Sequence, residues 1–222
     1  MTEEYYRTME SYMLSCMDDS AHDAEHVYRV LYNALEIAKT EPDTDYDVLI
    51  AACLLHDISR IDQIADPSLC HAAVGAEKAY EFLRSIGMEE AFAAQVRHCI
   101  ATHRFRKNLP PQTLEAKILF DADKLDVCGA IGIARTLQYS GETGRPIYTR
   151  NALGEISDGS GDTLDSFFRE YKFKLEGICE HFLTDKGRAL ARERHGAAMA
   201  YYQVLLAEVR HNEGLTALKN ML

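Results

Sequence analysis

Histidines and aspartates gather at three separate places in the sequence, each beside strongly apolar residues. The groups are His22 and His26, then His56 and Asp57, then Asp121, Asp123 and Asp126. His56 and Asp57 end an apolar segment (48–55), where an ionised carboxylate without a partner is strongly destabilised. Imidazole and carboxylate ligands without thiolates suit Mn, Fe, Co, Ni, Zn or Mg. The pattern therefore suggests that the three groups converge on a cation, as ligands in the cores of helical bundles commonly do.

Each of these groups also has an ordinary structural interpretation. A single histidine on an apolar helix face is usually a hydrogen-bonded core residue, and Asp121 can be a solvated side chain. Adjacent residues on a helix do not face one another, so His56 and Asp57 can share a metal only where the helix ends. His98 and His103 lie five residues apart, which fits one core and one surface histidine as well as two site residues.

Helices must position these groups, because apolar residues recur at helical spacing along most of the chain and alternating strand-like runs are missing. The expected helices cover approximately residues 3–17, 23–40, 45–56, 69–86, 89–102, 112–123, 125–139, 163–183 and 186–211. We expect an all-α fold, in which residues 1–222 form a single compact helical bundle. Its metal-binding core lies at about 20–140 and its C-terminal helices at about 163–211.

One connection, residues 140–162, is much longer than the others and contains five glycines. A loop of this length inside a compact domain is usually functional or disordered. It is either a lid over a site or a flexible excursion.

Composition limits the classes of partner. The chain has 222 residues and a net charge of −11 with a pI near 5.3, which argues against binding to a nucleic-acid polymer or a membrane surface, since both are anionic. The six cysteines are scattered without CxxC pairs, as expected in a reducing compartment. We therefore expect a cytoplasmic monomer or homodimer. An anionic substrate would need a local basic pocket, and Arg104, Arg106 and Lys107 form the densest basic cluster, which can equally be a solvated surface.

The motifs HDxxHxxRV (22–30), LLHDI (54–58) and DADKLD (121–126) together resemble the HD-domain superfamily of metal-dependent phosphohydrolases. The longer segment DADKLDVCGAIGIAR (121–135) is similar to small bacterial HD hydrolases, some of which are nucleotide pyrophosphohydrolases. The resemblance extends from about residue 20 to about residue 200. It implies that a divalent ion is bound by His26, His56, Asp57 and Asp123, and it leaves room for a second ion.

The resemblance also implies roles around the metal. Asp57 would orient or deprotonate the attacking water, His71 would act as a general acid, and the substrate-binding residues would be His22, His98, His103 and Lys124. Arg60 occupies the position at which some HD nucleotidases carry a catalytic glutamate, which argues against a mechanism with that glutamate. A GYP motif is missing, which argues against a cyclic-di-nucleotide phosphodiesterase.

The function implied by this resemblance is divalent-metal-dependent hydrolysis of a small phosphorylated molecule. A nucleotide is favoured, and in particular the release of pyrophosphate from a nucleoside triphosphate. Two alternatives stay open at this point: a phosphomonoesterase such as a 5'-nucleotidase, and a catalytically silent regulatory module that binds a metal or a nucleotide. The sequence leaves open which metal is bound and which phosphorus is attacked.

Overall fold

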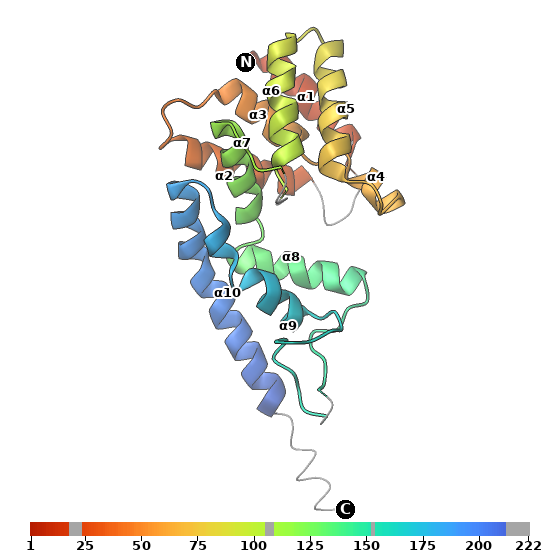
Figure 1. Cartoon of the computed structure of the whole chain (residues 1–222), viewed down its shortest axis with the longest axis vertical. Coiled ribbons are helices and arrows are strands. Elements are labelled where there is room, and N and C mark those ends of the chain that lie inside the picture. The colour runs from red at the N-terminus through yellow and green to blue at the C-terminus, as the bar shows by residue number, and fades with distance from the viewer. Residues whose placement is uncertain (18–23, 105–108, 152–153, 212–222) are drawn as a thin grey trace, which may run out of the picture. The chain divides into compact units, whose positions relative to one another are not determined.

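The computed structural model describes residues 1–17, 24–104, 109–151 and 154–211 (Figure 1). Within these ranges the regular structure is helical, apart from one isolated antiparallel bridge between Arg150 and Ile156. The predicted all-α fold class is therefore confirmed. No helix in the described ranges is long and apolar enough to span a bilayer.

Most helices begin and end near their predicted positions. Their bounds are α1 Glu3–Ser15, α2 Ala24–Ala38, α3 Tyr46–Leu55, α4 Arg60–Ala65, α5 His71–Ser85, α6 Glu90–Thr102, α7 Leu114–Leu125, α8 Gly129–Glu142, α9 Phe167–Glu170, the π-helical turn η1 Tyr171–Leu175, the 3-10 turn η2 Ile178–His181, and α10 Asp185–His211. The short helix α4 was not expected. The helix predicted over 163–183 is wrong: three short elements replace it, with Gly177 between the last two.

The chain packs as two compact units, each described here by itself. The first unit comprises Met1–Asp126 and Phe182–Arg188, and the second comprises Val127–His181 together with α10 from Ala189 onward. In the first unit α3 packs against α1, α2, α6 and α7. The side chain of Asp45 caps its N-terminus by accepting hydrogen bonds from the backbone of Asp47 and Val48. Because α3 is apolar on nearly every face, it is buried. His56, at its C-terminal end, therefore lies in the interior.

Asp121 on α7 has a structural role in the first unit. Its buried carboxylate accepts hydrogen bonds from the backbone N–H of Leu183 and Thr184, at 2.9 and 2.7 Å, and from the Thr184 hydroxyl at 2.7 Å. Burial raises the pKa of Asp121, although these hydrogen bonds oppose the increase. A Cβ at Gly187 would lie 2.6 Å from Asp121 Oδ2, so only glycine fits there. Asp121 therefore holds the start of α10 against α7.

In the second unit, aromatic residues hold the long loop in place. Tyr171 and Tyr202 stack with ring centroids 4.0 Å apart, and the Tyr202 hydroxyl donates to the carbonyl of Asp158. Gly159 adopts φ +92°, and a Cβ there would lie 2.3 Å from the carbonyl of Phe168. The loop thus packs directly on the backbone of α9.

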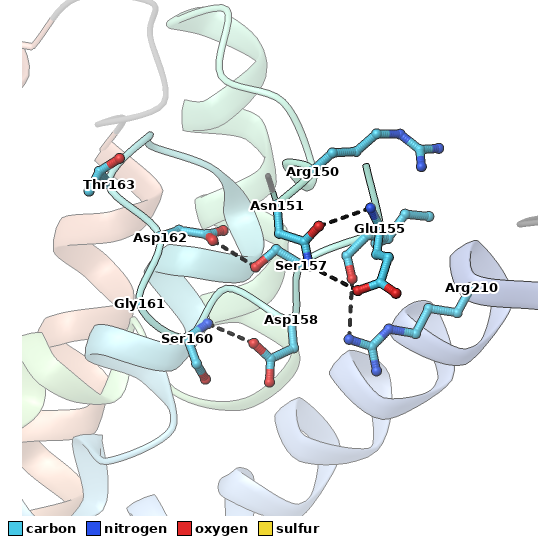
Figure 2. A pocket seen from close by; sticks show the side chains of 11 residues that line it. Arg150, Asn151, Glu155, Ser157, Asp158, Ser160, Gly161, Asp162, Thr163 and Arg210 are labelled. Carbon is cyan, nitrogen blue, oxygen red and sulfur yellow. Dashed lines mark hydrogen bonds between the residues drawn. The ribbon is translucent and has the colours of Figure 1, made fainter. Parts of the chain in front are cut away.

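The loop is also cross-linked by its own side chains. The carboxylate of Asp162 accepts hydrogen bonds from the hydroxyls of Ser157 and Thr149, both at 2.6 Å. The loop borders a polar cavity of about 850 Å³. Arg150, Glu155 and Arg210 are among the residues that line this cavity (Figure 2). The first residues of the predicted loop, 140–142, belong to α8. A gating role for the loop stays a prediction.

Replacing Asp121 should destabilise the first unit without touching the histidines. Asp121→Ala should lower the free energy of unfolding by on the order of 3 kcal/mol, because buried donors of Leu183 and Thr184 lose their acceptor. Urea unfolding followed by circular dichroism measures this change. Asp185→Ala is the matched control, since Asp185 is fully exposed in the first turn of α10 and should change stability by less than about 0.5 kcal/mol. Equal stability of the Asp121→Ala protein and the wild type would contradict this role.

Candidate metal centre

Four side chains from three helix regions meet in the first unit. His26 lies on α2, His56 caps the C-terminus of α3, Asp57 follows it, and Asp123 lies on α7. His26 Nε2 is 3.4 Å from His56 Nε2, 3.5 Å from Asp57 Oδ2 and 3.5 Å from Asp123 Oδ1. His56 Nε2 lies 3.9 Å from Asp57 Oδ2. We name these four residues the first group.

The separations suit ligands of one cation. Two nitrogen or oxygen atoms that each lie about 2.1 Å from a common ion are about 3.0–3.4 Å apart at the angles of tetrahedral and octahedral sites. The ligand atoms of His26, His56 and Asp123 all lie within 4.8 Å of one another. Two imidazole nitrogens and two carboxylates form a mixed nitrogen and oxygen set that suits a divalent first-row metal.

The hydrogen bonds of the two histidines direct their Nε2 atoms toward one another. His26 donates from Nδ1 to Asp126 Oδ2 at 2.7 Å, and His56 donates from Nδ1 to the carbonyl of Cys53 at 2.7 Å. In the neutral rings Nε2 then carries a lone pair. The two Nε2 atoms face each other at 3.4 Å, and a cation bound between them would accept both lone pairs.

Asp126 supports the first group although it is not one of its ligands. It is 1% exposed, and besides His26 it accepts hydrogen bonds from Arg29 Nε at 2.7 Å and Arg29 Nη2 at 3.1 Å. Asp126 was expected only as one of three aspartates that converge on a cation, and no role was expected for Arg29. Arg29 lies inside the motif HDxxHxxRV and Asp126 inside DADKLD, so the two motifs pointed to both residues.

The other carboxylate oxygen of Asp57 faces a second group. His71 Nε2 lies 3.3 Å and His103 Nε2 3.7 Å from Asp57 Oδ1. Both rings use Nδ1 elsewhere: His103 donates to the carbonyl of Ile100 at 2.6 Å, and His71 lies 2.6 Å from Gln63 Oε1. Arg60 Nη1, which can only donate, also lies 2.9 Å from His71 Nδ1, whereas Gln63 Oε1 can only accept, so these two contacts do not fix the tautomer of His71. Asp57, His71 and His103 could hold a metal as well, and we name them the second group.

Burial sets the protonation of these rings. Burial lowers the pKa of His56 to about 4 and that of His71 to about 3, so both imidazoles are neutral and able to act as ligands near neutral pH. Burial alone would raise the pKa of Asp57, but His56 and the hydrogen-bonding imidazoles lower it well below its usual range. For His103, burial opposes protonation, yet its hydrogen bond to Asp57 and the charge of Asp123 raise the pKa.

The remaining predicted residues lie differently. His98 Nε2 accepts a hydrogen bond from the backbone N–H of Gln112 at 3.3 Å and belongs to neither group. Lys124 Nζ lies over the ring of Phe120, 3.5 Å from its centroid. His22, Arg106 and Lys107 lie outside the described residues. The substrate-binding roles of His22, His98, His103 and Lys124 stay predictions.

An all-α unit that places histidine and aspartate side chains at helix ends around a shared carboxylate defines the class of metal-dependent helical hydrolases. Residues 23–128 match the HD domain family model. The protein YpgQ of Bacillus subtilis is 30% identical over 196 residues, covering 86% of both chains. The chain therefore belongs to the HD-domain family and is a metal-dependent hydrolase of the HD superfamily.

Solved structures of similar chains agree with this membership. A predicted HD superfamily hydrolase from an uncultured Thermotogales bacterium is 31% identical, with a TM-score of 0.61, and the match covers 93% of this chain and 92% of that one. Bacillus subtilis YpgQ in complex with ADP has a TM-score of 0.71 at 26% identity, over 92% of this chain and 97% of that one. A structure from Lactobacillus plantarum has a TM-score of 0.74 at 26% identity and covers 96% of this chain and 100% of that one.

Loss of the Asp126 charge should weaken metal binding without removing a ligand. In Asp126→Asn, the His26 ring loses its anionic acceptor and with it part of its basicity, so the affinity for Mn²⁺ should fall about 10- to 100-fold. Calorimetric titration of Mn²⁺ into the metal-free protein measures the change. His98→Ala serves as the control, because His98 lies outside both groups, and its affinity should match the wild type. An unchanged affinity of the Asp126→Asn protein would separate Asp126 from the metal centre.

Proposed function

We propose that the chain hydrolyses nucleoside triphosphates to the monophosphate and pyrophosphate, with a divalent ion held by His26, His56, Asp57 and Asp123. The observation that carries this proposal is the geometry of Asp57, whose Oδ2 faces the first group while its Oδ1 faces the second. The ADP complex of YpgQ supports a nucleotide ligand by analogy. The free thiols of all six cysteines fit the cytoplasmic location that we propose.

The proposed reaction divides its steps among the residues of the two groups. A divalent ion in the first group supplies Lewis acidity toward a phosphate oxygen and lowers the pKa of a coordinated water. Asp57 Oδ1 accepts the proton of the water that attacks the α-phosphorus. A new O–P bond forms, the bond from phosphorus to the bridging oxygen breaks, and pyrophosphate leaves with the bond electrons.

Two histidines of the second group are candidates for the proton donor to the leaving group. His71 was expected to act as this general acid, and its Nε2 lies 3.3 Å from Asp57 Oδ1. His103 contacts the same Asp57 oxygen at 3.7 Å, and we propose it as the alternative donor.

We also propose that one ion per chain is sufficient. Arg60 Nη1 lies 2.9 Å from His71 Nδ1, and this fixed positive charge disfavours a second divalent ion beside Asp57 and His71. The wild-type protein should therefore bind one Mn²⁺ per chain in equilibrium dialysis with metal analysis. His56→Ala should lose this ion, and His103→Ala should keep it. Two ions in the wild type, one of which is lost in His103→Ala, would establish a second ion in the second group.

Product analysis tests the reaction. A panel of nucleoside mono-, di- and triphosphates with Mn²⁺, Mg²⁺, Co²⁺ or Ni²⁺ should give pyrophosphate from triphosphates, and ¹⁸O from labelled water should appear in the monophosphate. Asp57→Asn should lower kcat by about 10²- to 10⁴-fold, because the group that accepts the proton is lost and the ion loses a ligand, whereas Arg97→Met should keep the wild-type rate, since Arg97 contacts Glu77 and the Tyr80 ring. Release of orthophosphate from monoesters alone would establish the phosphomonoesterase alternative. Binding of a nucleotide without turnover under every metal would establish the regulatory module.

A further inference from the structure

Arg104 directly follows His103 and carries a buried hydrogen-bond donor without an acceptor. Its Nη1 is buried and makes no hydrogen bond, while the residue as a whole is only partly buried. A buried donor on a charged group without an acceptor destabilises the folded chain. Such groups are rare in folded proteins and call for an explanation, such as a ligand that the group binds.

The position of Arg104 relates it to the second group. His103, its neighbour in sequence, faces Asp57 Oδ1. His103 is only 2% exposed, and Arg104 continues the chain directly from it. Arg104 therefore shares its backbone segment with a residue of the second group.

The other cations around the centre already have protein partners. Arg29 is paired with Asp126, Arg60 contacts Gln63 and Asp57, and Lys124 lies over Phe120. Around the centre, among the residues that the structure describes, Arg104 alone presents a buried guanidinium nitrogen without a hydrogen bond.

We propose that Arg104 binds a phosphate oxygen of the substrate through Nη1, next to the second group. This inference rests on the proposed phosphohydrolase function and names the part of the substrate that is recognised there. A guanidinium presents planar, directed donors that match phosphate oxygens, and it binds them more strongly than a neutral donor does. The ligand class is an oligophosphate chain, in which a phosphate group next to the reacting one reaches Arg104.

Inorganic tripolyphosphate is the probe, because it carries the phosphate chain without sugar or base. Calorimetric titration into the Mn²⁺-loaded wild type should give a measurable Kd. Arg104→Met should raise this Kd about 10- to 100-fold, as expected for the loss of a charge-assisted hydrogen bond, and Arg104→Lys should give an intermediate value. Arg97→Met is the matched control: Arg97 lies on α6, whose last residue is Thr102, 3.4 Å from Glu77 and over the Tyr80 ring, and its loss should change Kd less than twofold.

A stability measurement distinguishes a ligand-binding role from a structural one. Without ligand, Arg104→Met should unfold at the same or a higher urea concentration than the wild type, because an unsatisfied buried donor is removed. An unchanged Kd for tripolyphosphate, or a lower stability that parallels the weaker binding, would overturn the proposal. If tripolyphosphate binds through Arg104 while no nucleotide is hydrolysed, the proposed function fails and the role of Arg104 stands. If the wild type binds no tripolyphosphate, the role of Arg104 fails even where nucleotide turnover is observed.

Discussion

The buried carboxylate of Asp57 is the constraint on which the metal centre depends. It is 5% exposed, and four imidazole rings surround its two oxygens. An anion in such a place needs donors or positive charge. His26 and His56 have their Nδ1 protons committed to other acceptors, so their Nε2 atoms can bind a cation beside this carboxylate. A bound cation would satisfy the carboxylate and both nitrogens together.

At the ends of two helices, the same kind of hydrogen bond orients a histidine ring. His56 is the C-cap of α3 and His103 the C-cap of α6, and each donates from Nδ1 to the carbonyl three residues earlier. This bond gives a carbonyl of the last turn a side-chain donor, and the Ile100 carbonyl also accepts the backbone N–H of His103 at 3.4 Å. It also fixes the ring so that Nε2 points away from the helix. Both helices direct the negative end of their dipole toward the centre, which favours the binding of a cation.

Some of the candidate ligands could be predicted because ionisable side chains stand beside strongly apolar residues in the sequence. His56 and Asp57 end a segment so apolar that they had to be buried, and burial demanded partners. The spacing of His98 and His103 could not decide between them, since both belong to one helix region. What separates them is that His103 is the C-cap and His98 lies earlier on α6, where it reaches Gln112. Asp126 was missed because its bond to His26 joins residues 100 positions apart.

The second unit was less predictable for a different physical reason. The long loop is ordered by hydroxyl-to-carboxylate bonds to Asp162 and by the approach of Gly159 to Phe168. Neither interaction leaves a periodic pattern. The helix expected over 163–183 failed at its start, where Ser166 caps α9 by accepting from the N–H of Arg169. Glycine-rich and serine-rich composition alone cannot distinguish such a cross-linked loop from a flexible one.

Three aspartates at the C-terminal end of helix α7 serve both the fold and the candidate metal centre, because they point in different directions from the helix. A helical residue turns about 100° from the previous one, so Asp121 and Asp123 point about 200° apart, whereas Asp123 and Asp126 differ by only about 60°. Asp123 and Asp126 accordingly contact the two nitrogens of one ring, His26, while Asp121 faces the other way and holds the start of α10. The charge of Asp126 raises the basicity of the His26 ring, whose Nε2 lies beside Asp123. One short motif thus supplies a candidate metal ligand, a hydrogen-bond acceptor that orients a second candidate ligand, and a tertiary anchor, and a shift of any one aspartate by a single position would turn it away from its partner.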